Sequence, residues 1–318
     1  MEVFDKKKNE MTTWTPTNAN GTFSGDSMPL KAAFARSVNS VAVRLGQEMG
    51  IKRIISTAEA MGIKSPLDDT PSLALGSSDV NLLELTDAYC TVANNGMHHD
   101  PVLVTHIVDK DGNEVYSDRS QAEQVIPYKS AFLMQQLLQG GMKEPGGTSM
   151  SLWGYVGNFR DTDFGGKTGT SNNHSDAWFE CVSPNLVVGA WVGGEYRSIH
   201  FRTGALGQGS RTALPITGYF MNAVLSDPAF KKYHGHFKKP GEGDNITSDM
   251  YICQSYYKAV RRDTTHRDST NTVSIEEVNL DEDGEPIAMP SGTENKSSDT
   301  KKKSEKKRKT EEINFDDL

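Results

Sequence analysis

Apolar residues recur with the spacing of amphipathic helices through much of the first half of the chain. Gly50 and Gly62 stand where two of these periodic runs stop, as expected for glycines that end helices. Asn81, answered three positions later by Glu84, has the spacing of a helix N-cap. The expected helices cover residues 28–36, 41–49, 51–61, 81–92 and 128–139.

After Gly165-Gly166 the pattern changes to short runs rich in β-branched and aromatic residues. Strands are expected over residues 167–170, 176–182 and 186–192, joined as an antiparallel meander. An earlier hairpin is expected over residues 102–116, turning at Asp111-Gly112. Helices followed by a strand meander and a closing helix predict an α+β fold.

Hydrophobic periodicity fades near residue 259, which divides the chain into a domain of residues 1–260 and a tail of residues 261–318. The tail is rich in Asp, Thr, Ser, Glu, Asn and Lys, and it contains a basic run at 301–309. This composition cannot bury enough apolar surface to offset the entropy lost on ordering. The tail is therefore predicted to be disordered.

Composition excludes several classes of function. The net charge of −8 and the mean hydropathy of −0.56 argue against a nucleic-acid binder. No run of apolar residues is long enough to span a membrane, and residues 1–6 lack the pattern of a signal peptide. The three cysteines and eight histidines show no metal-ligand spacing, so no metal and no cofactor are expected.

Two short motifs carry candidate chemistry. Lys167-Thr168-Gly169-Thr170 places a cation, two hydroxyls and a bare backbone edge on one predicted strand, which suits an extended substrate that carries a carboxylate. The alternative is an ordinary edge strand with a solvated lysine. Ser37 and Asn39 lie between two predicted helices, where they present a hydroxyl and an amide or simply mark a helix boundary.

In this order the two motifs resemble the signature of penicillin-binding proteins and class A β-lactamases, which is Ser-x-x-Lys, Ser-Asp-Asn and Lys-Thr-Gly. Over about residues 14–230 the sequence is similar to the transpeptidase domain of a class A (bifunctional) penicillin-binding protein. The segments that carry this wider resemblance are Trp14-Thr-Pro-Thr-Asn18, Phe23-Ser-Gly25, Leu73-Ala-Leu-Gly76, Ala93-Asn-Asn-Gly96 and Ala213-Leu-Pro-Ile216.

The resemblance implies a mostly antiparallel sheet flanked by helices. It also implies peptidoglycan stem peptides and β-lactams as partners of the intact protein. The domain would face the periplasm or the extracytoplasmic side of the bacterial inner membrane, tethered by a membrane helix upstream of this chain.

The resemblance also implies a role for each matching residue. Ser37 would relay a proton to the leaving amine, and Asn39 would position the substrate amide. Lys167 would supply positive potential. Thr168 and Thr170 would bind the substrate carboxylate on either side of Gly169, and the backbone N–H of Thr170 would form half of an oxyanion hole. Val38 stands where the quoted signature has Asp, a change compatible with the penicillin-binding branch.

One element of the signature is missing, because no Ser-x-x-Lys occurs upstream of Ser37. The same letters recur at Ser255, Ser298 and Ser304, but out of motif order. The expectation is therefore an N-terminally truncated transpeptidase fold that begins after its nucleophile helix.

Three functions remain open on the sequence. The first is part of a peptidoglycan D,D-transpeptidase that is inactive alone because it lacks the nucleophilic serine. The second is a non-catalytic remnant or carboxylate-binding module. A serine β-lactamase is weaker, because residues 71–78 offer no glutamate for deacylation.

Overall fold

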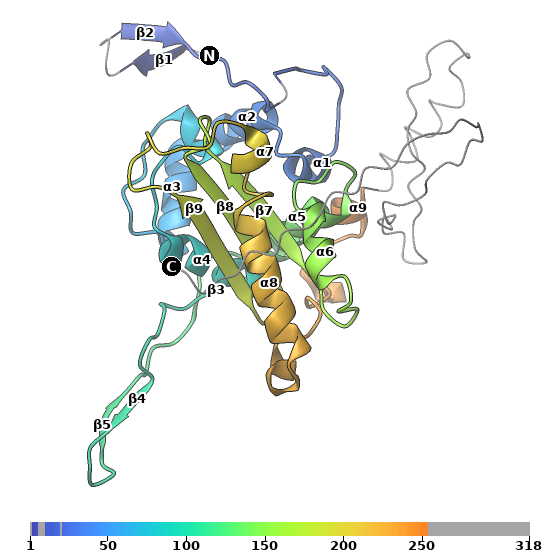
Figure 1. Cartoon of the computed structure of the whole chain (residues 1–318). Helices are drawn as coiled ribbons and strands as arrows, with labels where there is room; N and C mark the ends of the chain where they lie inside the picture. The colour runs from blue at the N-terminus through green and yellow to red at the C-terminus, as the bar shows by residue number, and fades with distance from the viewer. Residues whose placement is uncertain (1, 6–9, 20, 254–318) are drawn as a thin grey trace, which may run out of the picture. The chain divides into compact units, whose positions relative to one another are not determined.

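Three antiparallel strands form the sheet that carries the lysine motif (Figure 1). They are β7 (Gly165–Thr170), β8 (Asp176–Val182) and β9 (Val187–Gly193), hydrogen-bonded in the order β7-β8-β9. The predicted meander is confirmed. The computed structural model describes residues 2–5, 10–19 and 21–253. The predicted tail at 261–318 and Ser255, Ser298 and Ser304 lie outside these residues.

Strand register divides the sheet into two different faces. Phe179 pairs with Ala190 and faces a fully apolar core beneath α8 (Ala213–Ser226), together with Leu214 and Met221. Alternation along the strands places Lys167 and Glu180, which are direct cross-strand partners, on the opposite face. That second face packs against α4 (Leu82–Ala93) and α5 (Tyr128–Lys143). Burial of one face under α8 thus fixes the register that presents Lys167.

The predicted helices are confirmed, with two extensions. The helix expected from residue 41 begins at Asn39 as α2 (Asn39–Met49), so the prediction that Asn39 lies between two helices is wrong. The helix expected to stop at Gln139 runs on as α5 through two glycines to Lys143. Both glycines sit at close approaches: a Cβ on Gly140 would lie 2.9 Å from Lys31, and one on Gly141 would lie 2.8 Å from the carbonyl oxygen of Gly166. Tight packing against α1 (Leu30–Ala35) and β7 therefore outweighs the low helix propensity of glycine.

The remaining elements are short. The α-helices are α1 (Leu30–Ala35), α2 (Asn39–Met49), α3 (Ile51–Ala60), α6 (Trp153–Val156), α7 (Gly204–Gly207) and α9 (Asp249–Ile252). The 3₁₀ turns are η1 (Pro71–Leu75), η2 (Met150–Leu152), η3 (Pro228–Tyr233) and η4 (Glu242–Asp244). Two-stranded sheets pair β1 (Glu2–Asp5) with β2 (Glu10–Thr13), β3 (Met97–His98) with β6 (Glu123–Gln124), and β4 (His106–Val108) with β5 (Glu114–Ser117).

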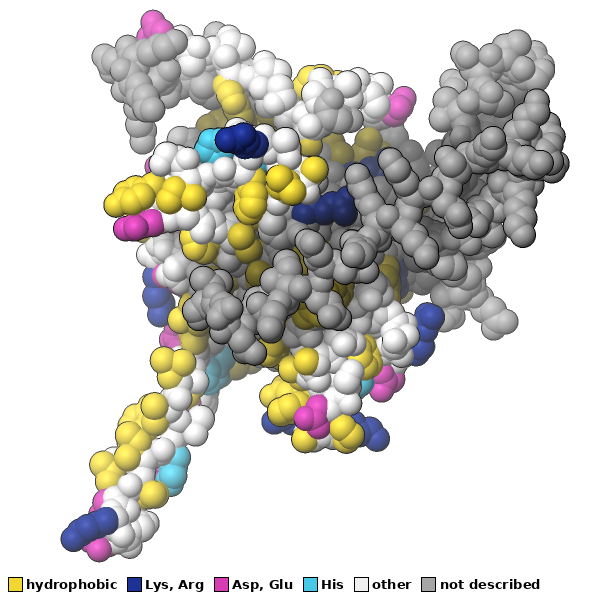
Figure 2. Space-filling view, viewed as in Figure 1, with side chains coloured by type: hydrophobic (Ala, Val, Ile, Leu, Met, Phe, Trp, Pro, Cys, Tyr) yellow, Lys and Arg dark blue, Asp and Glu magenta, His cyan; other side chains and the backbone are white. Residues whose placement is uncertain are grey.

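The β4–β5 pair is the predicted hairpin, and Gly112 takes a φ of 84° in its turn. Hydrophobic side chains line it in the space-filling view (Figure 2), with Leu103, Ile107, Val115 and Tyr116 all exposed. None of the described helices combines the length and the apolar composition that a membrane crossing requires.

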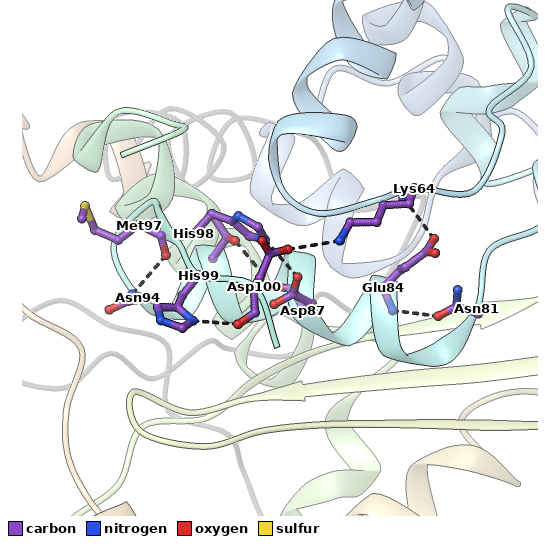
Figure 3. Close-up of polar contacts among 10 residues, drawn as sticks. Lys64, Asn81, Glu84, Asp87, Asn94, Met97, His98, His99 and Asp100 are labelled. Atoms are coloured by element: carbon purple, nitrogen blue, oxygen red, sulfur yellow. Dashed lines mark hydrogen bonds and ion pairs between the residues drawn. The ribbon is translucent and has the colours of Figure 1, made fainter. Parts of the chain in front are cut away.

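Polar contacts tie α4 to the segment that precedes it (Figure 3). Asn81 Oδ1 accepts a hydrogen bond from the backbone N–H of Glu84 at 2.9 Å, which confirms the predicted cap. Glu84 Oε2 in turn accepts bonds from the hydroxyl and backbone N–H of Ser65, and these bonds hold the pKa of its carboxyl below the usual value. His98 lies 3.0 Å from a carboxylate oxygen of Asp87 further along the helix. These contacts tie α4 to the segments on either side of it in the chain.

Candidate active site

Ser37 occupies a tight turn between α1 and α2. Its backbone takes a φ of 56°, in the left-handed region that a residue with a Cβ rarely adopts. The turn is held by hydrogen bonds from the N–H of Ser37 to the Phe34 carbonyl and from the N–H of Val38 to the Ala33 carbonyl, each 3.0 Å long. This strained turn points the Ser37 hydroxyl at the lysine of β7.

The ammonium of Lys167 donates a hydrogen bond of 2.9 Å to the Ser37 hydroxyl, although the two residues are 130 positions apart. A second bond of 2.8 Å reaches the carbonyl oxygen of Thr168. The ring centroid of Phe34 lies 5.9 Å from the same nitrogen. The fold therefore brings the hydroxyl of Ser37 and the amine of Lys167 together.

Burial lowers the pKa of Lys167 from 10.5 to about 8, because removal from water disfavours the charged amine. At pH 7 most molecules therefore carry the ammonium, and ~10 % carry the neutral amine. A lysine with this pKa can attract an anion and also exchange a proton with a neighbouring hydroxyl near neutral pH.

The two threonines of the motif each have a partner outside it. Thr168 Oγ1 donates a hydrogen bond of 2.8 Å to Thr148 Oγ1. Thr170 Oγ1 accepts a bond of 3.1 Å from the backbone N–H of Gly209. Neither Thr148 nor Gly209 can be identified from the sequence, because neither lies in a motif with a recognisable spacing. The only local signal at Thr148 is the Gly146-Gly147 pair before it.

Gly169 and Asn39 have different surroundings. A Cβ on Gly169 would lie 3.1 Å from the side chain of Trp178, so a glycine keeps the strand close to its neighbour. Asn39 is the first residue of α2, and its amide nitrogen donates a hydrogen bond of 2.8 Å to the carbonyl oxygen of Thr17. Within the part of the chain that the structure describes, no hydrogen bond joins Asn39 to Lys167.

Residues 2–179 match the penicillin binding protein transpeptidase domain family. The chain belongs to this family. Penicillin-binding protein 1A of Clostridium novyi is 33% identical over 222 residues, which are 68% of this chain and 24% of that protein. Penicillin-binding protein 2D of Bacillus subtilis is 31% identical over 182 residues, covering 57% of this chain and 26% of the relative. The similar proteins thus include penicillin-binding proteins of class A.

Solved structures agree on the fold. Penicillin-binding protein 1A from Haemophilus influenzae superposes with a TM-score of 0.63 at 25% identity, covering 76% of this chain and 39% of that one. The PonA1 protein from Mycobacterium tuberculosis in complex with penicillin V gives a TM-score of 0.57 at 22% identity, covering 73% and 64%. The expected penicillin-binding transpeptidase fold is confirmed. This chain spans about a quarter of the length of the curated relatives it matches.

The strained turn at Ser37 leads to a stability prediction. Ser37→Gly is expected to have a free energy of unfolding ~1 kcal/mol above that of Ser37→Ala, because both substitutions remove the hydroxyl that Lys167 bonds and only glycine adopts a positive φ without a Cβ clash. At Ser56, on the exposed side of α3, the order should be reversed, with the glycine variant ~1 kcal/mol less stable than the alanine variant through helix propensity. Urea unfolding of the four variants checks this. A Ser37→Gly variant no more stable than Ser37→Ala would show that the Ser37 turn is not strained.

Proposed function

We propose that this chain supplies the substrate-binding part of a peptidoglycan D,D-transpeptidase site. The main support for the proposal is the contact of 2.9 Å between the Lys167 ammonium and the Ser37 hydroxyl. It joins a cation whose pKa is lowered to about 8 to a hydroxyl that can relay a proton. Thr168 and Thr170 lie on the same strand, where a terminal carboxylate drawn to Lys167 would meet hydroxyl groups. Asn39 positions the substrate amide from the start of α2.

The reaction proposed for the complete site is acyl transfer. A serine nucleophile attacks the carbonyl of the penultimate D-alanine, the C–N bond to the last D-alanine breaks, and Ser37 passes a proton to the departing amine. The amine of a neighbouring stem peptide then displaces the serine from the acyl group. This chain has no Ser-x-x-Lys upstream of Ser37. We therefore assign it recognition of stem peptides and β-lactams, at the extracytoplasmic face of the membrane, and no turnover by itself.

A second candidate is a carboxylate-binding module with no catalytic role. The observation that favours it is the same absence of a nucleophile motif beside an intact lysine and hydroxyl cluster. Restoration of turnover distinguishes the two functions. A transpeptidase part gains activity when a segment containing Ser-x-x-Lys is fused ahead of residue 1, whereas a binding module gains none.

Binding of a diacyl-lysyl-D-alanyl-D-alanine peptide tests recognition directly. The free-acid peptide is expected to bind ~10–100-fold more tightly than its C-terminal amide, since a hydrogen bond between charged groups contributes ~1.5–3 kcal/mol. This preference should disappear as pH rises through about 8, because Lys167 then loses its proton while the carboxylate stays ionised. Titrations followed by NMR at several pH values provide the measurement.

Lys167→Met is expected to abolish the preference for the free acid. Lys52→Met, an exposed substitution on α3, is the matched control and should leave it unchanged. Equal affinity for the acid and the amide in the unmodified protein would rule out the proposed function.

A further inference from the structure

Thr148 lies in the loop between α5 and η2, and its backbone is fixed on two sides. The N–H of Thr148 donates a hydrogen bond of 3.0 Å to the carbonyl of Ala35 in α1. The N–H of Ser149 donates one of 3.1 Å to the carbonyl of Gly141 in α5. A Cβ on Gly147 would collide with that same Gly141 carbonyl, so the loop packs tightly against α5 at this point. Backbone contacts therefore position Thr148 without help from its hydroxyl.

The hydroxyl of Thr148 instead contacts the lysine-bearing strand. It accepts a hydrogen bond of 2.8 Å from the hydroxyl of Thr168, and both side chains are half-buried. A threonine hydroxyl has one proton to donate and two lone pairs that accept. The proton of Thr168 is thus engaged by Thr148, while the proton of Thr148 has no acceptor among the described residues. In the unliganded site, the donor still available at this pair is Thr148 and not Thr168.

We infer that Thr148 is a further recognition residue for the substrate carboxylate, acting through Thr168. The inference rests on the proposed function. When a carboxylate reaches the strand, Thr168 turns its O–H toward the carboxylate and accepts a hydrogen bond from the O–H of Thr148. Both hydroxyls keep their own protons, and only the direction of the bond between them reverses. The result is a chain of donors from Thr148 to Thr168 to the anion.

Two physical effects make this arrangement favourable for an anion. A hydroxyl that accepts a hydrogen bond becomes a stronger donor, so the bond from Thr168 to a carboxylate gains strength from Thr148 behind it. The rigid loop also holds the second hydroxyl in place before the ligand arrives, which reduces the entropy lost on binding. Thr148 lies between the Ser37 turn and the Lys167 strand, because its N–H bonds to Ala35 and its hydroxyl to Thr168.

The test compares affinities for the diacyl-lysyl-D-alanyl-D-alanine peptide and its amide. Thr148→Val is expected to weaken binding of the free acid ~3–10-fold, as for loss of one cooperative hydrogen bond, and to leave binding of the amide unchanged. Thr148→Ser should retain the affinity of the unmodified protein. Thr57→Val, which removes an exposed hydroxyl on α3, is the matched control.

A double-mutant cycle separates this role from a packing role. Once Thr168 is replaced by Val, Thr148→Val should have no further effect on binding of the free acid. Thr148→Ala provides the same deletion if the valine variant does not fold. Unchanged affinity in the hydroxyl-deleted variants, or additive losses in the cycle, would overturn the inference while the proposed function stands. If the unmodified protein does not prefer the acid to the amide, the proposed function fails and the inference fails with it.

Discussion

A fluorescent penicillin is expected to leave no covalent label on the purified chain. Acylation requires a serine activated by an adjacent base, and the sequence contains no Ser-x-x-Lys upstream of Ser37. Noncovalent recognition by Lys167 and the threonines does not survive a denaturing gel. The expected effect is all-or-none, and the fluorescence of the band on that gel measures it.

The strongest objection comes from the site itself. Ser37 lies 2.9 Å from a lysine whose pKa is lowered to about 8, and such a pair could act as nucleophile and base. Three features argue against this. The lysine donates to the serine, most of it is protonated at pH 7, and the serine is held in a strained turn that fixes its hydroxyl toward Lys167.

Substitutions identify the residue responsible if a label does form. If the labelled band disappears in Ser37→Ala, Ser37 is the nucleophile. That result would contradict its proposed role as a proton relay. A band that disappears in Ser255→Ala would point instead to the downstream Ser-x-x-Lys, which lies outside the described residues. A complete class A penicillin-binding protein labelled on the same gel is the positive control.

The sequence predicts the scaffold of the site better than its surroundings. The meander and the helices follow from hydrophobic periodicity, and the resemblance of the two motifs to the penicillin-binding signature implies a shared site for Ser37 and Lys167. Thr148 and Gly209 could not be found in this way, since they reach Thr168 and Thr170 through space from loops without any regular pattern. Loop geometry depends on packing, as the continuation of α5 through two glycines also shows.

The burial of the Glu180 carboxyl group is also not predictable from the local sequence pattern. Glu180 stands between Phe179 and Cys181 on β8, where the sequence pattern predicts only a strand. The fold buries its side chain to 2% exposure beneath α4, where the hydroxyl of Thr86 donates to Oε1 at 3.3 Å. The other oxygen has no hydrogen-bond partner within the described residues. Gly189 leaves room for the carboxyl group, because a Cβ there would lie 2.6 Å from Oε1.

Burial raises the pKa of Glu180 from 4.5 to about 8, since a carboxylate in this position would be poorly solvated. The folded protein therefore keeps a proton that the unfolded chain releases above pH 4.5. The contribution of Glu180 to stability is complete below pH 4.5 and declines as pH rises to about 8. Each unit of pKa difference corresponds to ~1.4 kcal/mol, so the whole loss is on the order of 5 kcal/mol.

Glu180→Gln is expected to remove this decline, because an amide fills the same space without a titrating proton. Other groups near Glu180 do not interfere in this pH range: burial raises the pKa of Cys90 to about 11 and that of Cys181 to about 12. Lys167, with its lowered pKa, changes the free energy of unfolding mainly above about pH 8. There the folded protein has lost the proton that the unfolded chain still holds, so stability rises with pH.

Urea unfolding between pH 4.5 and 8 gives the free energy of unfolding of Glu180→Gln and of the unmodified protein. The difference between the two values removes the contributions of groups that titrate in both proteins. As pH rises, the free energy of unfolding of Glu180→Gln should increase relative to that of the unmodified protein. Glu59→Gln, an exposed substitution on α3, is the matched control and should follow the unmodified protein. Parallel curves for Glu180→Gln and the unmodified protein would mean that Glu180 is already ionised in the folded state.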